Sequence, residues 1–192
     1  MKNRLKKILL SLTIISVMLL VVIAVFDNKY YIGKKIDSFN NVSVYYNGNP
    51  KNVNGRNLTK DGYNLGLNYQ CVEFVKRYYY EYLNHKMPNS YGHAKDFYDR
   101  ETLDGELNNS RNLIQFNNPS FSKPKVNDIL VLDKSIFNKF GHVSIVSRVN
   151  DNSIEVVQQN VFLNSREDYD LIFIDGKWKV DNERILCWLR ME

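Results

Sequence analysis

The stretch YQCVEFVKRYYYEYL, residues 69–83, decides the fold because it carries a clear helical pattern. Apolar side chains recur at i, i+3, i+4 and i+7 from Cys71 to Leu83, as on one face of an α-helix. Charged side chains occupy the other face, at Glu73, Lys76, Arg77 and Glu81. The pattern predicts an amphipathic helix that begins at Cys71, packs its apolar face on a core and exposes its charged face to solvent.

The segments on either side of this helix are less regular. Residues 42–46 read as a possible strand, and the Asn- and Gly-rich residues 49–69 predict a loop. A shorter helix is expected over residues 92–100, and residues 101–125 are expected to be mostly loop.

The second half of the chain predicts an antiparallel sheet. Candidate strands cover residues 128–133, 142–149, 153–159, 171–174, 177–180 and 185–190. A tight turn around Asn150-Asp151-Asn152 joins the second strand to the third, and Asp175-Gly176 is a hairpin signal. Helices followed by an antiparallel sheet predict an α+β domain over residues 41–192.

The N-terminus predicts an export signal. Residues 8–26 carry no charge, and roughly 20 apolar residues in a helix cross a bilayer core of about 30 Å. The basic residues within 1–7 should stay in the cytoplasm. We therefore expect a cytoplasmic tail (1–7), a transmembrane signal anchor (8–26), a linker (27–40) and an extracytoplasmic domain. The alternative is a cleaved, secreted form, although Val22-Ile23-Ala24 is a poor cleavage site.

Composition narrows the classes of partner. The net charge is +5, but without the four basic residues of the tail 22 basic residues nearly balance 21 acidic ones. No basic stripe remains for a phosphate backbone, so nucleic acid is not an expected partner. The two cysteines, Cys71 and Cys187, are expected to be free thiols, and no Cys or His pair has zinc-ligand spacing. We expect neither a metal nor a cofactor.

Cys71 is a candidate nucleophile. It lies in the first turn of its helix, where unpaired N–H groups and the helix dipole stabilise a thiolate. The alternative is a small buried residue on the apolar face. Cys187, between Leu186 and Trp188, is expected to be an inert core thiol.

His142 is the candidate base among three histidines. It begins a predicted strand after Gly141, and strands hold side chains in fixed directions, which suits a base that must be aimed. The alternative is a hydrogen-bonded histidine at a strand end. His85 and His93 are expected at the surface.

A third group should orient the base. Gln158 and Asn160 share one face of the next strand. If a three-residue turn pairs Val149 with Ser153, His142 faces Asn160 directly and Gln158 diagonally. A one-residue change in turn length would substitute Gln159. The alternative for these polar residues is an exposed strand end.

Residues 69–77, 141–146 and 158–160 resemble the three sequence blocks of CHAP domains, the cysteine, histidine-dependent amidohydrolases/peptidases. The resemblance covers roughly residues 40–190 and is strongest to the amidase domain of bacterial glutathionylspermidine synthetase/amidase. It implies a papain-like CHAP fold in which Cys71 is the nucleophile and His142 the general base. It also implies an oxyanion hole made by the Gln70 side chain and the Cys71 N–H.

One position departs from the family pattern. The relatives usually have Glu sixteen residues after the base, where this chain has Gln158. A neutral amide can hold the imidazole ring but cannot stabilise imidazolium by charge, so we expect activity with a shifted pH optimum. Strand alternation points Glu155 away from Gln158, so Glu155 is not expected to substitute.

The resemblance implies hydrolysis of an amide bond through a thioacyl intermediate on Cys71. The predicted anchor favours peptidoglycan as the substrate. One alternative is an amidase for a small γ-glutamyl or polyamine conjugate, and another is a silent cell-wall-binding module, which Gln158 alone encourages. The oligomeric state is left open.

Overall fold

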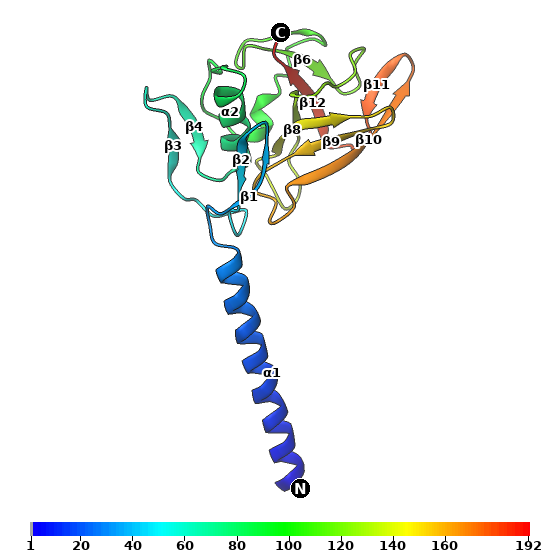
Figure 1. Ribbon diagram of the computed structural model, residues 1–192. Coiled ribbons are helices and arrows are strands. Elements are labelled where there is room, and N and C mark those ends of the chain that lie inside the picture. The colour runs from blue at the N-terminus through cyan, green and yellow to red at the C-terminus, as the bar shows by residue number, and fades with distance from the viewer. Residues whose placement is uncertain (1) are drawn as a thin grey trace.

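The N-terminal helix projects away from the folded domain (Figure 1). The computed structural model describes residues 2–192, without the side chains of residues 2, 5 and 26–28, so residue 1 of the predicted tail lies outside the described part. Helix α1 spans Lys2–Lys29. Its segment Lys6–Val25 is long and apolar enough to cross a membrane, as a signal sequence also would be, and none of it is buried. The core helix of a soluble protein would instead be mostly buried.

The rest of the chain is an α+β domain, as predicted. Two hairpins come first, β1 (Lys35–Phe39) with β2 (Val42–Tyr45) and β3 (Arg56–Leu58) with β4 (Asn64–Leu67). The helices follow, α2 (Cys71–Glu81) and the short 3-10 helix η1 (Ala94–Phe97). The remaining strands are β5 (Glu106–Asn108), β6 (Leu113–Asn117), β7 (Ile129–Leu132), β8 (His142–Val149), β9 (Ser153–Val157), β10 (Arg166–Ile174), β11 (Lys177–Val180) and β12 (Ile185–Arg190).

These last strands form one antiparallel sheet in the order β11-β10-β9-β8-β7-β12-β6-β5. The sheet curls until its ends approach each other. Ser120, just after β6, exchanges two backbone hydrogen bonds of 2.9 and 2.7 Å with Trp178 of β11. The curl encloses a core in which Trp188, Val156 and Leu130 are fully buried.

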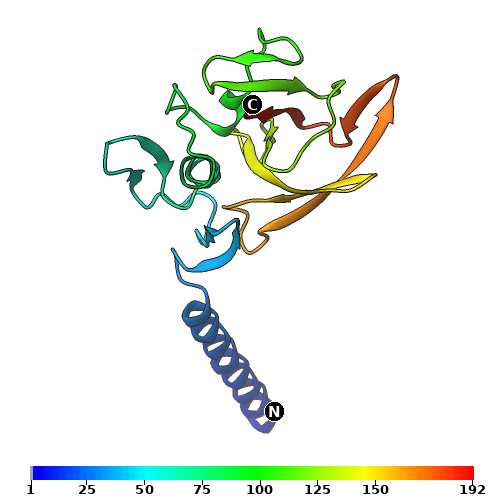
Figure 2. The same cartoon turned by 45° about the horizontal axis from the view of Figure 1, so that its top comes forward.

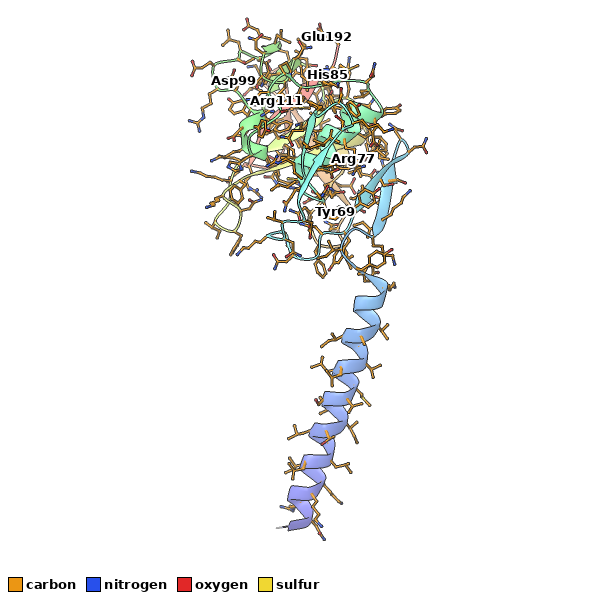
Figure 3. All side chains as sticks on the ribbon, turned by 90° about the vertical axis from the view of Figure 1, so that its left-hand side faces the viewer. Tyr69, Arg77, His85, Asp99, Arg111 and Glu192 are labelled. Carbon is orange, nitrogen blue, oxygen red and sulfur yellow. The ribbon has the colours of Figure 1, made fainter. Side chains whose placement is uncertain are left out.

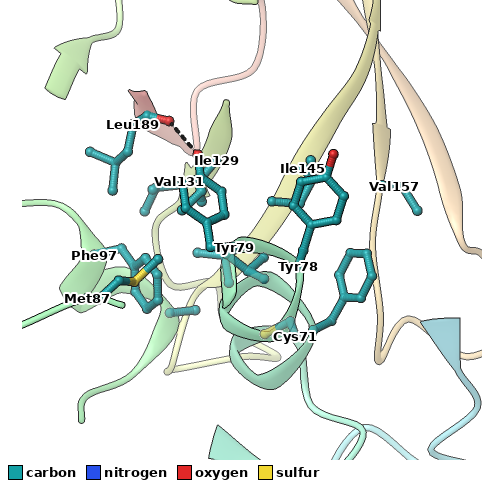
Figure 4. Close-up of a cluster of buried hydrophobic side chains, with 14 of the residues drawn as sticks. Cys71, Tyr78, Tyr79, Met87, Phe97, Ile129, Val131, Ile145, Val157 and Leu189 are labelled. Atoms are coloured by element: carbon teal, nitrogen blue, oxygen red, sulfur yellow. Dashed lines mark hydrogen bonds between the residues drawn. The ribbon is translucent and has the colours of Figure 1, made fainter. Parts of the chain in front are cut away.

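Helix α2 packs on the opposite face of this sheet. Its apolar residues Phe74, Val75, Tyr78 and Tyr79 enter a second core with residues of β7, β8 and β12 (Figure 4). The Tyr79 hydroxyl donates to the Leu189 carbonyl at 3.4 Å and to the Asn127 carbonyl at 2.8 Å. The apolar face predicted from the sequence is therefore the face that fixes the helix on the sheet.

The charged face of α2 is not solvated, contrary to the prediction. Glu73, Lys76 and Arg77 are buried, and Glu81 is exposed. Residues 49–69, predicted to be a loop, form the β3–β4 hairpin that covers this face (Figures 2 and 3). The hairpin approaches α2 closely because the hairpin residue at the contact is a glycine.

That glycine is Gly66 of β4. A Cβ added to it would lie 3.1 Å from the Cα of Glu73, so a larger residue would push the hairpin off the helix. The hairpin and its neighbours also supply polar partners. The Lys76 ammonium donates to the Asn64 and Ser90 carbonyls. These hydrogen bonds offset part of the burial of a charge.

Two other predictions of local structure need correction. Residues 101–125 are mostly loop, as predicted, but they include the short strands β5 and β6, and β6 lies beside β12 inside the sheet although it carries Gln and Asn. The helix predicted over residues 92–100 is reduced to η1. The stretch 27–40, predicted as a linker, contains β1. Pairing with a neighbouring strand outweighed local propensity in each new strand.

Candidate active site

Cys71 is the first residue of α2. Gln70 precedes it as the N-cap, with extended backbone angles and no side-chain capping hydrogen bond. The N–H groups of the first turn are thus not capped by that side chain, and they favour a negative charge at the helix start. The Cys71 side chain is 8% exposed, and Figure 4 shows its sulfur at the end of the helix beside the core.

His142 begins β8 and pairs with Leu132 of β7. Its Nε2 lies 2.9 Å from Oε1 of Gln158. The Gln158 amide nitrogen lies near two acceptors, 3.3 Å from the Asn164 carbonyl and 3.1 Å from Oε2 of Glu167, which fixes the orientation of the amide. Oε1 therefore accepts, His142 Nε2 carries the proton, and Nδ1 is left for the thiol.

Cys71 and His142 shift each other's pKa. Burial alone raises the pKa of the Cys71 thiol, but the charge of His142 and its hydrogen bond outweigh burial, and the net pKa lies below the ordinary value. Burial alone lowers the pKa of His142, but the Cys71 thiolate and the Gln158 hydrogen bond raise the net pKa above 6.5. Both shifts act toward thiolate and imidazolium, the reactive form of a cysteine nucleophile.

The predicted register of β8 and β9 is right near His142 but wrong at the turn. Val149 pairs with Ile154, not with Ser153, so the turn is one residue longer than expected. A bulge between Val146 and Arg148 removes this offset, and Ile145 pairs with Val157 as the predicted register requires.

β9 ends at Val157, and the side chains of the three polar residues that follow, 158–160, point in different directions. Gln158 contacts His142, although Asn160 was expected to face it directly. Asn160 has a φ of +71°, which turns it away from the strand. Its amide nitrogen donates to Oε1 of Gln70 at 2.5 Å. Gln159 points to α2 and donates to Glu73.

Gln70 lies beside Cys71 but its amide is engaged. The side-chain nitrogen donates 2.7 Å to the Asn52 carbonyl and 3.3 Å to the Pro50 carbonyl. Donation to an oxyanion would have to replace the longer and weaker of these two bonds. The Cys71 N–H lies at the helix start, where the N–H groups of the first turn have no intrahelical partner.

The other histidines and the second cysteine are placed as follows. His85 is buried, contrary to prediction, and its Nε2 lies 2.9 Å from the Arg111 carbonyl, while His93 is exposed. Cys187 is fully buried, and burial raises the pKa of its thiol well above the ordinary value. Both cysteines are free. Within residues 2–192, no group of three His, Cys, Asp or Glu side chains is placed to hold a metal ion.

Glu167 is the residue of this site that sequence reasoning missed. Its carboxylate accepts from Gln158, and it lies on β10, which begins at Arg166 although the strand was predicted to begin at Leu171. The alternation of exposed and buried residues at Asp168, Tyr169 and Asp170 was the signal that could have extended the strand.

A helix-start thiol, a facing imidazole and a group that orients the imidazole form the arrangement that a thiol-dependent hydrolase needs. The chain belongs to the CHAP domain family, which it matches over residues 60–160. Membership indicates a hydrolase of the amidase or peptidase type and confirms the resemblance of the three sequence blocks.

Individual proteins that are similar to this chain include a synthetase and a protein of known crystal structure. One is trypanothione synthetase from Crithidia fasciculata, 24% identical over 119 residues, which are 62% of this chain and 18% of that protein. The other is Ly7917, whose crystal structure gives a TM-score of 0.36 at 14% identity, covering 64% of this chain and 53% of the other. The similar region thus spans less than a fifth of the synthetase and about half of Ly7917.

Proposed function

We propose that this protein is a membrane-anchored cysteine amide hydrolase with a papain-like fold that cuts peptidoglycan outside the cytoplasm. One observation carries the proposal. The Cys71 thiol at the start of α2 faces His142, and Gln158 holds the His142 ring at 2.9 Å. Binding alone would require neither a low-pKa thiol nor an oriented imidazole, so a silent wall-binding module is disfavoured.

The proposed reaction has two halves. The Cys71 thiolate attacks the amide carbonyl, and the oxyanion accepts from the Cys71 N–H and the Gln70 amide. Each such donor contributes about 2.7–4 kcal/mol to transition-state stabilisation in comparable sites. The C–N bond then breaks as imidazolium at His142 gives its proton to the leaving amine, and a thioacyl-enzyme remains.

Water completes the cycle. His142, now neutral, takes a proton from water, and the resulting hydroxide adds to the thioester carbonyl. Collapse of this second tetrahedral intermediate breaks the C–S bond and releases a carboxylic acid product. The Cys71 thiolate and the His142 imidazolium are restored, so protons and electrons balance over the cycle.

Peptidoglycan is proposed because of the position of the domain. The apolar span Lys6–Val25 has basic residues at its N-terminal side, and such residues favour the cytoplasmic face. The domain that follows α1 would then lie outside, where the amide bonds of peptidoglycan are exposed. The bond would be either one within the stem peptide or the amide that joins peptide to sugar.

A second candidate is an amidase for a small γ-glutamyl or polyamine conjugate. The similarity to trypanothione synthetase favours it, and the same site chemistry would serve. The apolar N-terminal helix disfavours it, because a soluble conjugate in the cytoplasm would not require an exported enzyme.

The test uses the full chain in detergent with purified peptidoglycan, and released fragments are identified by mass spectrometry. Cys71→Ala should release none, and Cys187→Ala, which removes the buried second thiol, should release the same fragments as the unaltered chain. Fragments that depend on Cys71 would name the bond. If the folded chain released no fragments but cleaved a γ-glutamyl or polyamine amide, the second candidate would replace the first.

A further inference from the structure

We propose that Glu167 is a positioning residue that supplies, through Gln158, the negative charge that position 158 itself lacks. The inference rests on the proposed function of the Cys71–His142 pair. It concerns a residue on another strand, outside the three sequence blocks that identify the family.

The backbone places the two side chains together. Glu167 pairs with Val156 in the β9–β10 ladder, and the Gln158 N–H continues that ladder by donating 2.9 Å to the Ser165 carbonyl. Residues two apart on a strand point to the same side. Gln158 and Glu167 therefore project from the same side of neighbouring strands, in diagonal positions that can touch.

The contacts form a chain of three groups. Gln158 Oε1 accepts from His142 at 2.9 Å, and Gln158 Nε2 donates to Glu167 Oε2 at 3.1 Å. The carboxylate thus keeps the amide nitrogen turned away from the imidazole. A reversed amide would direct its N–H groups at the Nε2–H of His142, and that contact would join two donors.

The charge of Glu167 also reaches the imidazole. The titratable groups that face His142 are Cys71 from α2 and Glu167 from β10, while Lys95 of η1 packs against Gly141, which precedes His142. Burial lowers the pKa of His142, and the Cys71 thiolate, the Gln158 hydrogen bond and the Glu167 charge together raise the net pKa. Glu167 therefore favours imidazolium although it does not touch the ring.

Glu167 is itself held in place. The phenol of Tyr169, two residues along the same strand, is buried, and burial together with the Glu167 charge and a hydrogen bond to it raises the pKa of Tyr169. Tyr169 therefore stays protonated over the neutral range and acts as a donor to the carboxylate. The site contains one carboxylate and one amide. The carboxylate contacts the amide and the amide contacts the imidazole, whereas in a Cys-His-Glu arrangement the carboxylate contacts the imidazole directly.

The experiment measures the rate at which iodoacetamide alkylates Cys71 in the full chain in detergent. The pH is varied from about 3 to about 10 in steps of roughly half a pH unit, and mass spectrometry identifies the alkylated residue. No substrate is needed. A first rise reports formation of the Cys71 thiolate. A second rise reports deprotonation of His142, because a thiolate becomes more nucleophilic when the imidazolium beside it is lost and its own pKa rises.

Three variants separate charge from structure. Glu167→Gln removes the charge and keeps an amide oxygen that can accept from Gln158. The exchange Gln158→Glu with Glu167→Gln keeps one carboxylate and one amide in reversed order. Asp168→Asn is the matched control, since Asp168 is the exposed neighbour on the same strand and lies 3.9 Å from Arg148.

In Glu167→Gln the second rise should move to lower pH. The expected shift is a fraction of the roughly 1–3 pH units that a directly contacting opposite charge produces. The exchanged variant should return the second rise to the wild-type pH or above it, and Asp168→Asn should leave it unmoved. A second rise that stays in place in Glu167→Gln would overturn the role of Glu167. If Glu167→Gln does not fold, failure of the exchanged variant to reach the wild-type position would also overturn it.

This outcome is separate from the proposed function. A wild-type profile with a single rise at the ordinary thiol pKa would show that Cys71 and His142 are not coupled, which contradicts the proposed site. A two-step wild-type profile on a chain that does not cut peptidoglycan would contradict the proposed substrate and leave the test of Glu167 intact.

Discussion

The side-chain amide of Gln159 donates a hydrogen bond of 2.8 Å to the carboxylate of Glu73, and this contact joins the end of β9 to the first turn of α2. Its nitrogen also donates 3.1 Å to the Gln70 carbonyl, and its oxygen accepts from the Tyr45 N–H at 2.7 Å. Because Gln159 follows the partner of His142 and Glu73 lies two residues after Cys71, this contact fixes the distance between the helix that carries the thiol and the strand end that orients the base.

Replacing Glu73 should destabilise the domain strongly. The Glu73 carboxylate pairs with Arg77 Nε at 2.6 Å and accepts from Asn57 at 2.8 Å, and both charged groups are buried. Glu73→Ala leaves the guanidinium buried without its partner, which costs about 3–5 kcal/mol of unfolding free energy. Urea unfolding of the full chain in detergent measures the loss. The exposed Glu81→Gln is the control and should stay within about 0.5 kcal/mol. A loss under about 1 kcal/mol in Glu73→Ala would contradict the structural role of the pair.

Amide hydrolysis should follow a bell-shaped dependence on pH. The net pKa of Cys71 is lowered because His142 outweighs burial, so the thiolate persists below the ordinary thiol range. The net pKa of His142 is raised above 6.5 because Cys71 and Gln158 outweigh burial. Activity should rise as Cys71 loses its proton and fall at higher pH as His142 loses the proton that it must give to the leaving amine.

The measurement for this prediction is kcat/KM against pH, which reports the free enzyme. Both limbs should be present, with the acid limb below the ordinary thiol pKa of 9.0. A profile that rises through pH 9 in a single step would mean that Cys71 titrates as an ordinary thiol, and the proposed coupling to His142 would then be wrong.

The strongest periodic patterns predicted their elements well. The i, i+3, i+4 repeat after Cys71 predicted α2 and the face that enters the core, because burial of an apolar stripe decides a helix of this length. The predicted strands match β8, β9, β11 and β12 within a residue or two at each end. These are the segments in which local pattern and tertiary packing agree.

Long-range contacts explain the predictions that failed. Nothing local to α2 shows that an Asn-rich hairpin covers Glu73, Lys76 and Arg77, so the charged face was predicted to be solvated. Glu167 follows Gln158 by nine residues and reaches it only because β9 and β10 pair. Each case depends on which distant strand becomes a neighbour, and a single sequence does not carry that information in its periodicity.

The prediction of which residue contacts His142 depended on the strand register to within one residue. The bulge between Val146 and Arg148 compensates for a longer turn, and two errors of one residue in opposite directions leave the register near His142 correct. The early end of β9 then turns Asn160 toward Gln70 and leaves Gln158 against the ring. A bulge has no strong sequence signal here, so the choice among these polar residues needed the structure.

The apolar N-terminal helix should retain the protein in the membrane. The segment Lys6–Val25 is long enough to span a bilayer. Protein recovered from membranes after alkaline extraction should therefore have the mass of a chain that still contains this segment. Introducing Arg at Ile15 and Met18 should reduce membrane retention, since Arg near the middle of a span costs about 2.5–3.5 kcal/mol per residue. Recovery of a soluble form that begins after Ala24 would show that the helix is a cleaved signal peptide.

Gln70 should act on the rate of the chemical step. Its amide lies beside Cys71 but donates to the Asn52 and Pro50 carbonyls, and Asn160 donates to its oxygen and so sets which way its nitrogen points. If the nitrogen exchanges the 3.3 Å bond to Pro50 for the developing oxyanion, Gln70→Ala should lower kcat by about 10²–10³-fold with little change in KM. Asn160→Asp removes the donor that orients the amide but leaves Gln70 in place, so its loss of kcat should be smaller.

Unfolding of both variants is measured in parallel, because a loss of stability would lower the active fraction without altering kcat per folded molecule. An unchanged kcat in a stably folded Gln70→Ala would mean that Gln70 only anchors the loop at residues 50–52 and that the Cys71 N–H stabilises the oxyanion without it.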